Sequence, residues 1–161
     1  MMQLMEQQTK RQLRSGEGFC LALIDLDHFK QVNDRWGHPM GDEVLARIGQ
    51  LLRSHTRVQV DTAARYGGEE FILLLPDTGV NEACLVAEKI TARLREERFV
   101  ADGGAFNVTQ SVGIAQVVQG DVDEALRAAD RNLYQAKQAG RDRMVASVAF
   151  PEDVNHPAPA V

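Results

Sequence analysis

The chain has 161 residues, of which 44% are hydrophobic, and a formal net charge of −5 at pH 7. This length suits one well-buried domain and is too short for two of ordinary size. The negative charge argues against broad binding to nucleic acid or to an anionic membrane, and no segment approaches a membrane span. Cys20 and Cys84 lack the spacing of a disulfide framework and are expected to be buried free thiols. With no apolar segment of signal-peptide length at the N-terminus, the cytoplasm is the expected compartment.

The first elements follow from hydrophobic patterning. Residues 1–14 are predicted to form a helix, and its exposed start suggests a piece of a longer signalling protein. Residues 19–26 form a continuous apolar run, which is typical of a buried strand. A short helix over 28–36 is expected to end at Gly37, because glycine commonly stops helices.

A second helix and a hairpin come next along the chain. Apolar residues recur at helical spacing over 41–53, and Asp42-Glu43 suits the positive N-terminal end of such a helix. Two short strands, 62–66 and 71–75, flank Gly67-Gly68. Because glycine adopts backbone angles unfavourable for other residues, the pair predicts a tight reversal at a hairpin tip.

The C-terminal half repeats the alternation of helices and strands. Helices are predicted over 81–95 and 121–139, and strands over 106–118 and 144–148. Gly113, in the middle of a β-branched strand, predicts a bend or bulge, and Gly140 predicts a helix cap. The proline-rich tail from residue 150 onward is expected to be disordered.

The order of elements predicts the fold class. A central hairpin requires adjacent antiparallel strands, which excludes a doubly wound parallel sheet. We therefore expect an α/β (α+β) fold with a mixed, mostly antiparallel central sheet flanked by helices. Residues 1–17 are assigned to an N-terminal helix or truncated domain start, 18–149 to the main domain and 150–161 to the tail.

Two pairs of acidic residues stand at the ends of predicted strands. Asp25 and Asp27 end the strand over 19–26, and Glu69 and Glu70 follow the two glycines of the hairpin. If the two strands are neighbours, these carboxylates would form a divalent-cation site, because hard cations take oxygen ligands. The alternative is that the acids merely keep the hairpin tip hydrated, but a second acid pair on another strand favours the metal.

Several linked motifs resemble one family. They run in a single order over roughly residues 18–147: Asp25–Asp34, Gly37-His38, Gly41-Asp42, Gly67–Phe71, Ser111–Ala115, Ala129-Asp130, Tyr134–Lys137 and Gly140-Arg141. In this combination the chain resembles the GGDEF family of diguanylate cyclases, here with Gly-Gly-Glu-Glu-Phe. The resemblance implies a palm-like nucleotidyl cyclase fold and condensation of two GTP molecules into cyclic di-GMP. It also implies Mg²⁺ or Mn²⁺ as cofactor and a homodimer, with one GTP per subunit.

The resemblance also assigns the metal site and the proton acceptor. The metal ligands would be Asp25, the backbone carbonyl of Leu26, and Glu69. Glu70 would take a second metal or assist deprotonation of the attacking hydroxyl. The sequence does not separate its role from that of Glu69, which is the family's usual candidate for proton acceptor. Asp27 would either join the site or brace it by hydrogen bonds.

By the same resemblance, substrate contacts come from three segments. Asn33 and Asp42 would hold guanine, with His38 nearby, and a carboxylate facing guanine N1–H has no equivalent partner on adenine. The triphosphate would receive backbone N–H groups of Phe29 and Lys30 and two cations at the end of the last helix. Those cations are Lys137 and Arg141, which lie four residues apart and would share a helix face.

One stretch departs from the family pattern. Many members carry an inhibitory product site, Arg-x-x-Asp, before the glycine pair, but here Val58 stands in place of the arginine ahead of Asp61. Arg57 is one position away, and such a displacement usually points a side chain elsewhere. We therefore expect this site to be degenerate. The family's opening Leu-Thr-Gly-Leu-type segment is also missing from the chain.

Two other functions remain open from the sequence. A regulatory module could bind GTP or cyclic di-GMP with little or no catalysis, although the full set of acids and cations argues against it. An adenylyl cyclase of similar fold is disfavoured by Asp42.

Overall fold

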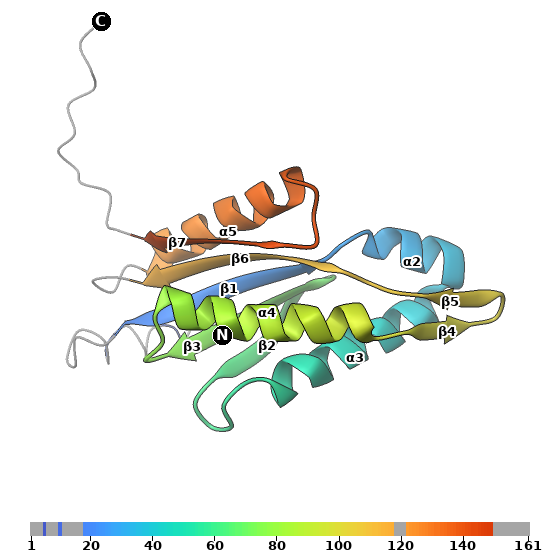
Figure 1. Cartoon of the computed structure of the whole chain (residues 1–161), viewed down its shortest axis with the longest axis horizontal. Coiled ribbons are helices and arrows are strands. Elements are labelled where there is room, and N and C mark those ends of the chain that lie inside the picture. The colour runs from blue at the N-terminus through green and yellow to red at the C-terminus, as the bar shows by residue number, and fades with distance from the viewer. Residues whose placement is uncertain (1–4, 6–9, 11–17, 118–121, 150–161) are drawn as a thin grey trace, which may run out of the picture.

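The central strand of the sheet is β1 (Phe19–Leu26). In the computed structural model, which describes Met5, Lys10 and residues 18–117 and 122–149, five strands run in the order β2-β3-β1-β6-β7 (Figure 1). The other strands are β2 (Thr62–Gly67), β3 (Glu70–Pro76), β6 (Gln110–Val117) and β7 (Met144–Ala149). Only the β6–β7 pair is parallel, so the sheet is mixed and mostly antiparallel, as predicted.

Two predicted segments lie largely or wholly outside the described residues. The N-terminal helix over 1–14 is described only at Met5 and Lys10, which are helical. The tail over 150–161 lies outside the description altogether.

Helices cover both faces of the sheet. Alternate residues of β1 enter two separate core clusters, because successive side chains of a strand point to opposite faces. One cluster joins them to α3 (His38–Ser54) and α4 (Val80–Glu96), and the other joins them to α5 (Val122–Gln138). Every residue of β1 is consequently buried, which explains its continuous apolar sequence.

The junction between α2 (Phe29–Trp36) and α3 differs from the prediction. Gly37, with φ +82°, ends α2, but α3 begins at once with His38 rather than at residue 41. Pro39 in its first turn favours this early start, because proline is suited to the first helical positions. Asp42 therefore lies in the second turn and not at the N-terminus, so the expected charge–dipole role of Asp42-Glu43 was wrong.

The predicted hairpin is present, but its two glycines do not adopt the backbone angles that were expected to cause it. Gly67 pairs with Glu70, so Gly68 and Glu69 form the turn, and the register shifts at Tyr66. Neither glycine has φ in the left-handed region, in contrast to the expectation. A Cβ on Gly68 would meet nothing within 4 Å, and the missing side chain instead leaves space beside the turn.

The strand predicted over 106–118 is divided. Its first residue, Phe106, belongs to a separate ribbon formed by β4 (Phe99–Ala101) and β5 (Gly104–Phe106). Phe106 stacks on Trp36 of α2 with ring centroids 5.3 Å apart, and also on Phe99 at 5.6 Å. These aromatic contacts hold the ribbon against α2, away from the main sheet (Figure 1). Val118 lies outside the described residues.

Gly113 is not a bulge. The pairing of β6 with β1 and with β7 runs through it without a shift. A Cβ at this position would lie 2.0 Å from the carbonyl oxygen of Ala129 and 2.3 Å from the amide nitrogen of Leu133. The glycine is therefore required by the close approach of α5 to the sheet.

The end of α5 carries the predicted glycine cap. Gly140 has φ +113°, and its amide donates to the carbonyl of Lys137. The amide of Arg141 donates to the carbonyl of Ala136 at 3.0 Å. This pair of bonds is a Schellman motif, which satisfies the last carbonyls of a helix.

Both cysteines are free thiols, as predicted, but only one is fully buried. Cys20 is 0% exposed and its thiol donates to the carbonyl oxygen of Thr78, whereas Cys84 is half-buried on α4. In the part of the chain that the structure describes, we find no helix with both the length and the apolar character needed to cross a membrane.

Candidate active site

The end of β1 and the hairpin tip lie side by side. Asp25 is the register partner of Glu70, and the amide of Leu26 donates to the carbonyl of Glu69 at 3.3 Å. Strand pairing therefore brings the two predicted acid groups to one edge of the sheet. The two acid pairs are therefore neighbours in space, as the sequence suggested.

Asp25 is a buried carboxylate with one cationic partner among the described side chains. It is 9% exposed, and the ammonium of Lys137 lies 2.8 Å from its Oδ2. Burial raises the pKa of Asp25 above its ordinary value, and the hydrogen bond and charge of Lys137 oppose that rise. The negative charges of Glu69 and Asp27 raise the pKa further, which places both near the same carboxylate.

Asp27 accepts three hydrogen bonds at the end of β1, an arrangement compatible with the bracing role that is one of its two predictions. Its Oδ1 accepts from the hydroxyl of Ser111 at 2.7 Å, and its Oδ2 accepts from the hydroxyl of Thr109 at 2.7 Å. Oδ2 also accepts from the amide of Asp142 at 3.0 Å. This carboxylate joins the end of β1 to β6 and to the turn after α5.

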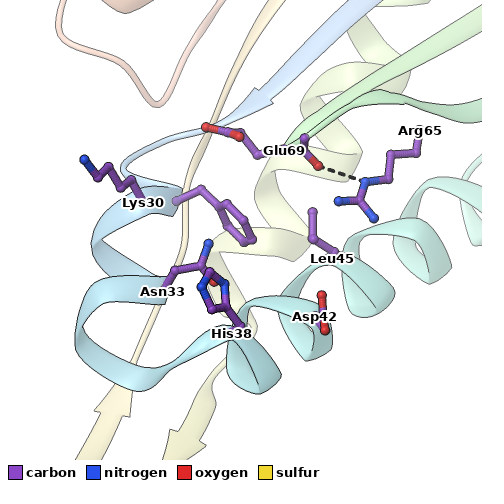
Figure 2. A pocket seen from close by; sticks show the side chains of 9 residues that line it. Lys30, Asn33, His38, Asp42, Leu45, Arg65 and Glu69 are labelled. Carbon is purple, nitrogen blue, oxygen red and sulfur yellow. Dashed lines mark hydrogen bonds between the residues drawn. The ribbon is translucent and has the colours of Figure 1, made fainter.

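A cavity of about 440 Å³ lies beside the hairpin turn (Figure 2). Nine residues line it: Phe29, Lys30, Asn33, His38, Asp42, Leu45, Arg65, Gly68 and Glu69. The structure thus brings together the three residues predicted to lie around guanine with one of the hairpin acids. Its volume falls in the usual range for small-molecule sites.

Three lining residues were missed from the sequence, namely Leu45, Arg65 and Gly68. The Nε of Arg65 donates to the carbonyl of Gly68 at 2.8 Å, so its guanidinium reaches over the turn (Figure 2). The sequence did place Arg65 directly ahead of the hairpin glycines. It did not show the strand register, which determines that the side chain of Arg65 points into the cavity.

Gly41 gives Asn33 its place in the cavity. A Cβ at Gly41 would lie 2.0 Å from Oδ1 of Asn33 and 3.2 Å from the ring of Phe29. The side chain of Asn33, on α2, therefore packs directly on the backbone of α3. Any side chain at residue 41 would push it away.

Phe29 and Lys30 open α2, which is the position predicted for them; their role as amide donors stays a prediction. The helix has no side-chain cap, so its first N–H groups are not satisfied by one. The side chain of Lys30 extends outward, away from the other labelled groups (Figure 2).

Lys137 and Arg141 do not share a helix face, contrary to the prediction. Lys137 is in the last turn of α5, but Arg141 follows the glycine cap and has φ +64°. The spacing of four residues therefore does not place the two side chains on one helix face. Of the two, Lys137 is ion-paired with Asp25, which together with Glu69 and Glu70 forms the acid corner of the site.

The two hairpin acids line different cavities. Glu69 lines the cavity described above, whereas Glu70 lines another, of about 550 Å³, along α5. The lining of this second cavity is Glu70, Asp130, Arg131, Leu133, Tyr134, Gln135 and Lys137. The acid corner is therefore bordered by a cavity on each side of the hairpin tip.

Arg57 does not point elsewhere, as had been expected, but contacts Asp61. Its Nη2 lies 2.7 Å from Oδ1 of that carboxylate, whose side chain is only 3% exposed. The same Nη2 donates to the carbonyl of Pro76 and to the hydroxyl of Thr78. Gln59, with φ +63°, takes up the extra residue in the intervening turn. Val58 is 84% exposed.

The donors at the corner suit a hard cation. Within the described residues, no group of three or more His, Cys, Asp or Glu side chains could hold a metal ion. The predicted set has two carboxylates, Asp25 and Glu69, and the carbonyl of Leu26. Mg²⁺ is commonly held by one or two carboxylates together with water and substrate phosphates, so this all-oxygen set fits such an ion.

Together these features define an α/β domain with a carboxylate corner at a sheet edge and a polar cavity beside it. A family model described as the diguanylate cyclase GGDEF domain matches residues 1–143. The chain belongs to the GGDEF domain family. Divalent-metal dependence is general among the diguanylate cyclases of this family.

Individual relatives agree with this assignment. Diguanylate cyclase A of Treponema denticola is 42% identical over 134 residues, covering 81% of this chain and 36% of that protein. The crystal structure of diguanylate cyclase SiaD from Pseudomonas aeruginosa, in complex with its activator SiaC, has a TM-score of 0.85 at 38% identity. That match covers 90% of this chain and 56% of the other.

A second solved structure is similar over nearly its whole length. The active GGEEF domain of a diguanylate cyclase from Vibrio cholerae has a TM-score of 0.82 at 31% identity, covering 93% of this chain and 94% of that one. By contrast, the chain spans about a third of the length of the first curated relatives it matches.

Proposed function

We propose that this domain is a diguanylate cyclase, which condenses two GTP molecules into cyclic di-GMP and two pyrophosphates. The observation that carries the proposal is the juxtaposition of Asp25 and Glu69 at one sheet edge, beside a cavity lined by Asn33 and Asp42. Family membership supports the same activity. Because the reaction consumes GTP, the cytoplasm is its expected compartment.

The metal in this proposal is Mg²⁺ or Mn²⁺, held by Asp25, Glu69 and the carbonyl of Leu26. When bound, it neutralises charge that develops on the phosphoryl oxygens during transfer. The hydrogen bonds around Asp27 keep the end of β1 in register with the turn after α5. They thereby preserve the relative positions of the metal ligands and of Arg141.

Guanine selectivity comes from Asn33 and Asp42. A carboxylate at the guanine edge accepts from N1–H and from the exocyclic amine, and adenine offers neither group in the same arrangement. Substrates that leave such a polar group unpaired are rejected strongly. His38 and Leu45 complete the walls of the cavity around the base.

The chemical step forms one bond and breaks another. The 3′-oxygen of one GTP bonds to the α-phosphorus of the other, and the bond from that phosphorus to the bridging oxygen of pyrophosphate breaks. Glu70 or Glu69 accepts the hydroxyl proton. The triphosphate receives the amides of Phe29 and Lys30 and the cations of Lys137 and Arg141. A second, identical transfer closes the ring.

Two copies of the domain are required, because each holds a single GTP and the nucleophile of one must reach the phosphorus of the other. In this proposal the catalytic unit is a homodimer with its two cavities facing each other. Neither nucleic acid nor membrane contact is part of it.

Product inhibition through residues 58–61 is not part of the proposal. The carboxylate of Asp61 is already held by Arg57, and Val58 offers no charge. Cyclic di-GMP that binds there would have to compete with an internal ion pair.

The test is chromatography of nucleotide products after incubation with GTP and Mg²⁺ or Mn²⁺, with and without a dimerising fusion. We expect cyclic di-GMP, and a loss of at least about 100-fold in rate for Asp25→Ala and Glu69→Ala. Glu43→Ala, which removes an exposed acid of α3 outside both cavities, is the matched control and should leave the rate unchanged.

Three results would contradict the proposal. GTP binding by calorimetry without any product, also in the fused form, would indicate a regulatory binding module. Faster turnover of ATP than of GTP would indicate an adenylyl cyclase. Full activity of Asp25→Ala would remove the assigned metal site.

A further inference from the structure

The ion pair between Lys137 and Asp25 occupies a proposed metal ligand. The two groups are 2.8 Å apart, and their side chains are 32% and 12% exposed, so the pair is only partly open to water. It joins the end of α5 to the end of β1, which lie at the same end of the sheet (Figure 1).

The two side chains meet because they share a face of the sheet. Asp25 follows Leu21 and Leu23 in the alternation of β1, and those leucines pack in the cluster that contains residues of α5. Lys137 therefore approaches Asp25 from the α5 side. The cavity that Glu69 lines is formed with residues of α2 and α3 instead.

The backbone beneath Lys137 is fixed by packing and capping, whereas its side chain has rotatable bonds. Ala136 is 0% exposed, and the capping bonds of Gly140 and Arg141 hold the last turn of α5. A lysine side chain has four methylene groups with rotatable bonds. Its ammonium can consequently exchange one anionic partner for another without movement of the helix.

A divalent ion at Asp25 and the ammonium in its present position would repel each other. Mg²⁺ binds carboxylate oxygens at about 2.0–2.1 Å, so it would lie within a few ångströms of Lys137 Nζ. Like charges at such a separation in a partly buried place repel strongly. The two cations therefore compete for the carboxylate of Asp25.

We propose that Lys137 is a place-holding counter-ion, which neutralises Asp25 while the metal is absent and transfers to the nucleotide phosphates when metal and GTP bind together. The inference rests on the proposed function, because it takes Asp25 to be a metal ligand. Lys137 then opposes binding of the metal alone and favours binding of the nucleotide. It therefore couples the two ligands.

The coupling has a defined sign. Nucleotide phosphates draw the ammonium away from Asp25, which raises the affinity of the corner for the metal. By linkage, the metal raises the affinity for the nucleotide by the same factor. Without the lysine charge, the metal should bind more tightly by itself and gain less from the nucleotide.

The experiment measures Mn²⁺ binding by calorimetry, first without nucleotide and then with 3′-deoxy-GTP, which lacks the attacking hydroxyl. The variants are Lys137→Met and Lys137→Gln, both without charge, and Asp25→Asn. Lys89→Met is the control, because it removes the same charge from an exposed lysine of α4 that lines neither cavity.

We expect both Lys137 variants to bind Mn²⁺ alone about three- to tenfold more tightly than the wild type, the range that partly screened ion pairs allow. They should bind 3′-deoxy-GTP more weakly than the wild type does. The factor by which the nucleotide raises the affinity for Mn²⁺ should also be smaller in these variants. Lys89→Met should match the wild type in all three quantities.

Unchanged or weaker binding of Mn²⁺ alone in both Lys137 variants, with Asp25→Asn still losing it, overturns this inference and leaves the proposed function intact. Mn²⁺ affinity that does not change in Asp25→Asn overturns the metal assignment and, with it, both proposals.

Discussion

Single residues decide the shape of the candidate nucleotide cavity, and Gly41 is the clearest case. Asn33 reaches its position only because residue 41 has no side chain. The group in the way is the far end of a flexible side chain and not backbone. An added methyl group should therefore move Asn33 without unfolding the helices.

Gly41→Ala should lower the affinity for GTP about tenfold or more, because Asn33 leaves the base, while the free energy of unfolding changes by less than about 1 kcal/mol. Gly49→Ala is the control in the same helix, since a Cβ there would meet nothing within 4 Å. Nucleotide calorimetry and urea unfolding measure the two quantities. Equal GTP affinity in both variants would contradict the assignment of Asn33.

Cys20 provides a residue-level prediction for alkaline pH. Burial raises the pKa of its thiol from 9.0 to about 12, whereas the thiol of the unfolded chain ionises near its ordinary value. The folded protein thus retains a proton that the unfolded chain releases. The stability that this thiol contributes is complete below about pH 9 and is lost as the pH rises toward 12.

Between about pH 8 and 10, the free energy of unfolding should fall by about 1.4 kcal/mol more in the wild type than in Cys20→Ala. Urea unfolding at the two pH values measures how much stability each protein loses. The cost of the smaller alanine side chain is the same at both pH values, so it cancels from this comparison. The prediction fails if both proteins lose the same amount.

At the scale of elements, the contact between α5 and β6 sets the geometry of the acid corner. α5 packs so closely that the backbone of Ala129 and of Leu133 fills the space where Gly113 would carry a side chain. This distance decides how far Lys137 can reach toward Asp25. The contact is therefore part of the site as well as of the core.

Gly113→Ala should destabilise the domain by about 3 kcal/mol or more, because the obstacle is helix backbone, which cannot rotate away. Thermal and urea unfolding measure the loss, and Gly49→Ala should show none. A Gly113→Ala protein of wild-type stability would mean that α5 lies farther from the sheet.

At the scale of the whole molecule, the proposed function makes this domain half of a catalytic unit. Each domain has one cavity for which guanine is the proposed ligand and one acid corner, but the proposed reaction needs two nucleotides in opposite orientation. The relatives reach well beyond the length of this chain, and additional domains are one means by which dimers are held together.

The initial rate should therefore rise with the square of the protein concentration when dimers are scarce, and linearly once they predominate. A dilution series of product formation, together with sedimentation to find the dimer fraction, tests this. A rate strictly proportional to concentration at every dilution, where sedimentation shows monomers, would contradict the homodimer.

The elements that sequence patterns predicted best are those whose environment is uniform. β1 is buried on both faces, so its apolar run marks its limits, and the predicted range over 19–26 agrees with Phe19–Leu26. The start of α3 and the division of the strand after Phe106 were missed, because each depends on contacts with another element. Arg57 was misplaced for the same reason, since a turn residue redirected it toward Asp61.

By itself the sequence determined the order of elements, the mixed sheet and the acids that end two of its strands, because periodicity and turn residues act over a few neighbouring positions. Only the tertiary structure decided which acid meets which partner. Strand register set Asp25 opposite Glu70, and the packing of α5 on one face brought Lys137 to Asp25. Such pairings join residues far apart in the chain, and they depend on how the faces of the sheet are covered.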